Sequence, residues 1–167
     1  MRKQQSIAMK PISEKWVRYT LSVRGSIESG DLYYTSSRDL YSRIIQLVTK
    51  SDISHVGIFY WLGGRLFTIE CNTNGCTMIP ASNRFKGKVI IQRTGMRPKA
   101  SVLMRDVGRV SYDWLGVILS PFVRLQRSER YCAEFVEDSL GVFLGPTDRN
   151  VYPVDVYQHF NAKEIHG

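Results

Sequence analysis

Two strand-like runs joined by a pair of glycines constrain the fold of this chain more than any other feature. SHVGIFYWL at 54–62 and RLFTIECN at 65–72 are rich in β-branched and aromatic residues, and Gly63-Gly64 lies between them. A glycine pair between such runs is typical of a two-residue β-hairpin turn, because both central residues need positive φ. The sequence therefore predicts a tight hairpin at this position.

The predicted turn also fixes which residues of the hairpin face one another. With the two glycines as the turn residues, the pairing runs back along both strands without a break. Directly opposed residues share one face of a sheet, and so do residues two apart on one strand. The opposed pairs are then Leu62 with Arg65, Phe59 with Thr68, and Gly57 with Glu70.

His55 and Glu70 are diagonal neighbours on one face of this predicted hairpin. Gly57 has no side chain, so we expect it to leave room for the Glu70 carboxylate to lean toward the imidazole of His55. A histidine oriented by a carboxylate is half of a nucleophilic site, and the missing half is a serine or a cysteine. The hairpin thus predicts a base and its orienting partner.

Cys132 is the candidate nucleophile. It lies in the first turn of a helix predicted over ERYCAEFVEDSLG, 129–141, on the face that the apolar residues share. The backbone N–H groups and the dipole at a helix start favour a thiolate, and Arg127 and Arg130 add positive potential. Taken singly, a strand histidine, a helix cysteine and a strand-end glutamate are each more often structural.

The rest of the chain predicts an α+β fold with a mainly antiparallel sheet and packed helices. No repeat or linker divides it, so we expect a loose tail over 1–10 and a single domain over 11–167. The further predicted elements are strands at 30–35, 76–82 and 88–94, an amphipathic helix over 37–50, a helix opened by Pro98, an irregular helix over 111–126 and a short helix or turn over 152–160.

Composition adds weaker expectations about partners and location. The formal net charge of +8 favours an anionic partner, yet the basic residues are scattered and give no firm sign of nucleic acid. The basic start lacks an apolar signal region, and no run approaches the about 20 apolar residues of a membrane span. We therefore expect a cytoplasmic protein with reduced thiols, although Cys71 and Cys76 flank a turn and could pair under oxidising conditions.

No cofactor is predicted, and metal binding is the least favoured reading. The histidines and the remaining cysteines show no ligand spacing that a metal site requires. The residues considered are His55, His159, His166, Cys71 and Cys76.

The chain resembles the circularly permuted NlpC/P60, papain-like cysteine hydrolases, with the nearest branch being the YiiX/YebB-like group that includes a poxvirus protein family. The resemblance covers roughly residues 25–160 and rests on GDLYYT, SHVGIFY, FTIEC, YDWLG and RYCAEFVEDSL, with Ala133 where serine is common. It implies a permuted NlpC/P60 fold, with Cys132 as nucleophile, His55 as general base and Glu70 as orienting residue. It also implies a contact of Tyr112 with the oxyanion or substrate, whereas Asp31 is expected to organise a strand start.

The function implied by the resemblance is a cysteine hydrolase or acyltransferase that acts on a peptide, amide or lipid-ester bond. The sequence does not choose among these substrates. One alternative is a catalytically inactive interaction module, as in a phage or viral accessory protein. A nucleic-acid-binding protein, which rests on charge alone, is the other.

Overall fold

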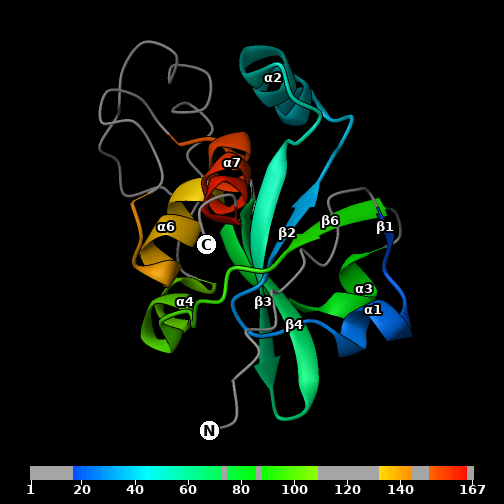
Figure 1. Cartoon of the computed structure of the whole chain (residues 1–167), viewed down its shortest axis with the longest axis vertical. Helices are drawn as coiled ribbons and strands as arrows, with labels where there is room; N and C mark the ends of the chain where they lie inside the picture. Colours follow the sequence, from blue (N-terminus) through cyan, green and yellow to red (C-terminus); the bar gives the residue numbers. More distant parts are fainter. Residues whose placement is uncertain (1–16, 73–74, 86–87, 109–131, 144–150, 165–167) are drawn as a thin grey trace, which may run out of the picture.

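An antiparallel sheet organises the molecule (Figure 1). The computed structural model describes residues 17–72, 75–85, 88–108, 132–143 and 151–164. The six strands follow the order β1-β6-β2-β3-β4-β5, and each neighbouring pair is antiparallel. They are β1 (Val17–Arg18), β2 (Leu32–Thr35), β3 (His55–Leu62), β4 (Arg65–Asn72), β5 (Gly75–Pro80) and β6 (Lys88–Gln92). The predicted α+β class and the antiparallel sheet are confirmed.

The β3–β4 hairpin has the predicted turn and register. Gly63 and Gly64 have φ of 56° and 74°, values that residues other than glycine rarely adopt. The pairs Leu62–Arg65 and Phe59–Thr68 form as expected, and the paired ladder runs back to Ile58 and Ile69. The ladder ends there, one position short of Gly57 and Glu70.

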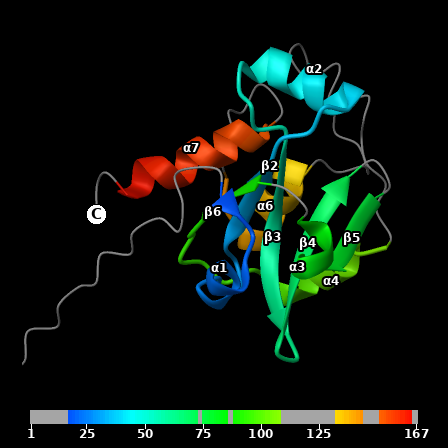
Figure 2. The ribbon, with the colours of Figure 1, turned by 90° about the vertical axis from the view of Figure 1, so that its right-hand side faces the viewer.

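Helices cover both faces of the sheet (Figures 1 and 2). The larger core cluster lies between the sheet and α6, with Val56, Ile58 and Phe135 among its members. A smaller cluster around Tyr33 and Phe59 fills the other face. The helices are α1 (Leu21–Gly25), α2 (Leu40–Thr49), α3 (Ala81–Arg84), α4 (Ala100–Asp106), α6 (Cys132–Leu140) and α7 (Pro153–Glu164).

Several element boundaries differ from the sequence prediction. Strand β1 and helix α1 were not predicted, and α3 replaces the end of the strand expected over 76–82. Helix α4 begins after Lys99 rather than at Pro98, and α7 is a full helix rather than a short turn. The tail expected over 1–10 and the irregular helix over 111–126 lie outside the described residues.

Within the described ranges, no helix combines the length and the apolar character that crossing a membrane requires.

Candidate active site

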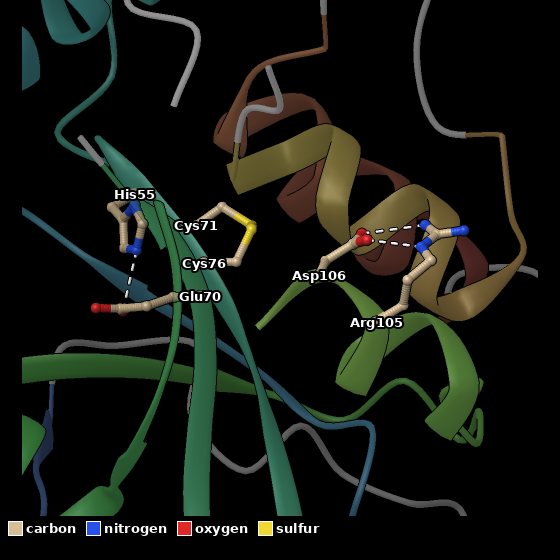
Figure 3. The surroundings of a disulfide bond; sticks show 6 residues. All are labelled: His55, Glu70, Cys71, Cys76, Arg105 and Asp106. Atoms are coloured by element: carbon tan, nitrogen blue, oxygen red, sulfur yellow. Dashed lines mark hydrogen bonds and ion pairs between the residues drawn. A yellow bond between two sulfur atoms is a disulfide. The ribbon is translucent and has the colours of Figure 1, made fainter. Parts of the chain in front are cut away.

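His55 and Glu70 form a hydrogen-bonded pair on one face of the hairpin (Figure 3). The Nε2 atom of His55 lies 3.0 Å from Oε2 of Glu70, and both side chains are largely buried. His55 is the first residue of β3, so its ring stands at the end of the strand. The hairpin register thus produces the contact that the sequence predicted.

Two further side chains hold the Glu70 carboxylate. The Nε atom of Arg84 donates to both oxygens, at 2.9 Å to Oε1 and 3.0 Å to Oε2. The hydroxyl of Tyr33, which is fully buried on β2, donates to Oε2 as well. Hydrogen bonds to a carboxylate from three side chains fix its orientation more firmly than one does. Glu70 is therefore held in one orientation by these three partners.

The role predicted for Gly57 is wrong in its detail. The space above its Cα does not admit the carboxylate; the phenol ring of Tyr33 fills it, and a Cβ on Gly57 would overlap that ring. Tyr33 pairs with Gly57 across the β2–β3 ladder, so its side chain crosses over the glycine to reach Glu70. The glycine clears a path for the tyrosine rather than for the glutamate.

Cys132 begins α6, which packs against β3 and β4. The residue is buried, with 2% of its surface exposed, and belongs to the cluster on the helix side of the sheet. Helix α6 thus brings Cys132 to the two strands that carry His55 and Glu70. The predicted contact between His55 and Glu70 is therefore confirmed, whereas the role of Cys132 as their partner stays a prediction.

The electrostatics favour an ionised pair. Burial lowers the pKa of His55, but the charge and hydrogen bond of Cys132, followed by those of Glu70, outweigh it and raise the pKa to about 10. Burial raises the pKa of Glu70, but His55 and then Arg84 outweigh it and lower the pKa to about 2. At neutral pH the imidazole is therefore protonated and Nε2 donates to the carboxylate.

A cavity of about 390 Å³ adjoins the pair. It lies between the sheet and α2, and its wall includes His55, Glu70 and Arg84 together with hydroxyl side chains. Cys132 is not among the lining residues. The full lining is Thr35, Ser37, Asp39, Ser42, Ile45, Ser54, His55, Glu70, Asn72 and Arg84.

Other residues singled out from the sequence have different outcomes. Asp31 organises the start of β2, because its carboxylate accepts from the Glu28 amide at 2.8 Å and pairs with Arg93 at 2.9 Å. Burial outweighs these partners and raises the pKa of Asp31 to about 6. Tyr112, Arg127 and Arg130 lie outside the described residues.

Sequence reasoning missed Arg84 and Tyr33. Tyr33 lies in a run correctly predicted as a strand, but nothing in the run tells which strand pairs with it. Arg84 is the last residue of α3, a short helix that was not predicted, and no local pattern marks it. Both contacts depend on tertiary pairing.

The expectation of reduced thiols is corrected for two of the cysteines. Cys71 and Cys76 face each other across β4 and β5 and form a disulfide, whereas Cys132 is a free thiol. Cys71 follows Glu70 directly, so the disulfide points to the opposite face of the sheet from the His55–Glu70 pair (Figure 3).

Comparison with known proteins identifies a structural neighbour. The crystal structure of the metalloprotein YiiX from Escherichia coli O157:H7, described as DUF1105, superimposes with a TM-score of 0.55 at 25% sequence identity. The match covers 71% of this chain and 69% of that chain. Neither the models of known protein families nor the curated proteins give a match. The chain therefore has a YiiX-like fold.

That neighbour is described as a metalloprotein, but the described part of this chain holds no set of metal-ligand side chains. No group of three or more His, Cys, Asp or Glu side chains is placed there to hold a metal ion. Glu70 and His55 are instead bonded to each other, and Arg84, a cation, occupies both carboxylate oxygens. These residues do not fit a metal centre.

Proposed function

We propose that this protein is a cysteine hydrolase or acyltransferase of the permuted NlpC/P60 type, with Cys132 as nucleophile, His55 as base and Glu70 as orienting residue. The observation that carries the proposal is the 3.0 Å hydrogen bond between His55 and Glu70 on the hairpin against which α6, the helix of Cys132, packs. The YiiX-like fold supports it, because the sequence resemblance points to the same group.

The proposed reaction begins with attack by the Cys132 thiolate on an amide or ester carbonyl. The protonated His55 then gives its proton to the leaving amine or alcohol, and an acyl-enzyme remains. Water or another acceptor, deprotonated by His55, attacks the thioester, the acyl group leaves on that acceptor, and the Cys132 thiolate and the protonated His55 are restored. Backbone N–H groups at the start of α6 would stabilise the oxyanion, as helix N-termini do.

Glu70 and its partners would keep the imidazole in one orientation through both steps. Because Arg84 and Tyr33 occupy the carboxylate, Glu70 cannot turn away from His55 without breaking their hydrogen bonds. The geometry needed for proton transfer is therefore already formed in the free protein.

A direct test uses acyl-type electrophilic probes on the full chain, followed by mass spectrometry of the labelled peptide. We expect one adduct on Cys132, its loss in Cys132→Ala, and strong reduction in His55→Ala. Hydrolysis of a panel of p-nitrophenyl esters and amino-acyl anilides then separates esterase from amidase activity. A folded protein that neither labels at Cys132 nor turns over any member of the panel contradicts the proposal.

The burial of Cys132 favours a second candidate, a binding module that has kept the fold without turnover. A thiol that is 2% exposed and does not line the cavity is not open to a substrate in this conformation. In that case Cys132 would resist the probes in the native protein and react after unfolding. The labelling experiment therefore decides between the two candidates.

A further inference from the structure

Helix α2 carries its apolar stripe on the outside of the molecule. Leu40 and Leu47 are 70% and 80% exposed, and Val48 is 40% exposed. The sequence periodicity is that of a helix packing on a core, where such residues are normally buried. Here the inward face holds Ser42 and Ile45 instead. An outward stripe of large apolar side chains marks an interaction surface.

The orientation of α2 is fixed by specific contacts. Asp39 caps the helix by accepting from the amide and hydroxyl of Ser42, at 2.9 and 2.7 Å. Gln46 donates to the backbone carbonyls of Ser37 and Asp52 on either side of the helix. Ile45 packs with Tyr152 from the segment that leads into α7. The stripe is therefore held outward by contacts on the opposite face.

Cations surround this stripe. Arg38 precedes the helix, Arg43 lies between Leu40 and Leu47 on the exposed side, and Lys50 caps the C-terminus. The acidic neighbours are Asp39, which is engaged in the cap, and the exposed Asp52. An apolar stripe flanked by basic residues matches an anionic lipid surface, because apolar side chains enter the acyl boundary while cations meet the headgroups. The whole chain, with a net charge of +8, is also opposite in charge to an anionic membrane.

The stripe also lies beside the cavity of the candidate site. Asp39, Ser42 and Ile45 from the inner side of α2 form part of the cavity wall that faces His55 and Glu70. Figures 1 and 2 show α2 beyond the end of the sheet where β2 ends and β3 begins. A surface that binds the outer side of α2 would therefore lie one helix away from this cavity.

We propose that α2 is an interfacial helix that docks the protein on anionic phospholipid, with Leu40, Leu47 and Val48 inserted and Arg38, Arg43 and Lys50 at the headgroups. The docking requires no chemistry at Cys132, so it can be tested independently of the enzymatic proposal. Insertion of the two leucines supplies the apolar part of the affinity, and the three cations supply the part that depends on lipid charge and salt.

The test is flotation of the full chain with vesicles of phosphatidylcholine alone or with about one third phosphatidylglycerol. We expect binding to the anionic vesicles and little to the neutral ones. The double variant Leu40→Gln/Leu47→Gln is expected to lose about tenfold or more in affinity, since each leucine contributes apolar burial at the interface. Arg43→Gln/Lys50→Gln is expected to weaken binding to anionic vesicles selectively, and Cys132→Ala is expected to bind like the wild type.

Matched controls lie on other surfaces of the same chain. Leu21, 83% exposed on α1, and Leu62 at the hairpin tip give the control Leu21→Gln/Leu62→Gln, and Arg65→Gln/Lys88→Gln controls for charge. Circular dichroism confirms that each variant is folded. The proposal is overturned by absent wild-type binding, by equal loss in the leucine control, or by binding that the α2 leucines do not affect. Self-association that depends on Leu40 and Leu47, without vesicle binding, would instead assign the stripe to a second copy.

Discussion

Arg84 and His55 bind the same carboxylate, and Arg84 spans both of its oxygens. The Nε atom of Arg84 lies 2.9 and 3.0 Å from Oε1 and Oε2 of Glu70, and His55 Nε2 lies 3.0 Å from Oε2. A buried carboxylate between two cations is strongly held in its ionised form, which the lowered pKa of Glu70, about 2, reflects. Arg84 thereby sets the orientation of Glu70 and, through it, that of His55.

Replacement of Arg84 by Gln is expected to lower turnover by about tenfold, because Glu70 loses the partner that fixes both of its oxygens. Arg105→Gln is a matched control. Arg105 lies on α4, away from His55, and its Nε atom donates to the buried carboxylate of Asp106 at 2.7 Å (Figure 3). The measurements are kcat/KM and the pKa of His55 by NMR titration. A positioning role lowers the histidine pKa in Arg84→Gln only; equal effects of both variants would indicate a general loss of stability.

The three central residues are expected to differ in their effect on turnover. Cys132→Ala and His55→Ala should each reduce kcat by about 1,000-fold or more, and Glu70→Gln by about 100-fold, since an amide still accepts a hydrogen bond but stabilises the imidazolium less. His55→Ala should stay folded, because Val56 and Ile58 on the other face of β3 supply its packing. Thermal melts accompany the kinetics. Unfolding of all three variants, with no substrate found for the wild type, would favour the binding module.

Stability should depend on pH through the His55–Glu70 pair. Folding raises the pKa of His55 from 6.5 to about 10, so its contribution is complete below pH 6.5 and is lost as the pH rises through 10. Folding lowers the pKa of Glu70 from 4.5 to about 2, so its contribution is complete above pH 4.5 and is lost as the pH falls through 2. Between pH 4.5 and 6.5, Glu70→Gln should cost about 3 kcal/mol, because it leaves buried cations unpaired.

Denaturant unfolding across this pH range measures the effect. Glu28→Gln is the control, since Glu28 forms an exposed ion pair with Arg93. The difference between wild type and Glu70→Gln should be largest inside the window and shrink on both sides. A difference that does not vary with pH would show that the pair does not ionise as described.

Gly57→Ala is expected to destabilise the fold by about 1–3 kcal/mol, because its Cβ would overlap the ring of Tyr33. Gly25→Ala is the control, since a Cβ there meets no atom within 4 Å. Chemical denaturation of both variants gives the comparison. Adding Tyr33→Leu to Gly57→Ala should recover part of the loss, as coupled neighbours do. Equal stabilities of the two alanine variants would exclude the close packing of Tyr33 on Gly57.

The disulfide leads to a prediction about thiol labelling. Iodoacetamide on the native, unreduced protein should label Cys132 and leave Cys71 and Cys76 unmodified, as they are bonded to each other. Replacing both disulfide cysteines by Ser should cost about 2 kcal/mol, because the bond closes a short loop with a sequence separation of 5. Peptide mapping and denaturant unfolding check these outcomes. Labelling of Cys71 without a reductant would show that the bond is not formed in the protein under those conditions.

Local patterns predicted the hairpin and the His55–Glu70 contact. The register from Gly63-Gly64 held along both strands and correctly placed His55 beside Glu70, because turn geometry and the alternation of strand faces are local rules. Within the described residues, the helix predicted over 129–141 is present as α6 from Cys132 to Leu140. Local rules did not predict the pairing of β2 with β3, which places the ring of Tyr33 over Gly57.

The outward stripe of α2 shows where periodicity is insufficient. The spacing of Leu40, Ile44, Leu47 and Val48 correctly predicts a helix. It does not say whether the apolar face of the helix packs on the core or faces outward. That choice depends on the Asp39 cap and on contacts of Ser42, Ile45 and Gln46 with distant segments. The contact of Arg84 with Glu70 was likewise not predictable from local patterns, since α3 places Arg84 beside Glu70 only after β4 and β5 have paired.

The tight β3–β4 hairpin has a consequence for the order of events during folding. Hairpins close within about 1–10 microseconds, since their contacts are local. His55 and Glu70 therefore have a fast route to each other, whereas Cys132 reaches them only when the distant α6 docks on the sheet. Pairing between distant parts of a chain is slower than local pairing. The His55–Glu70 contact can thus form early in folding, whereas Cys132, the proposed nucleophile, joins the sheet only when the core around α6 is nearly complete.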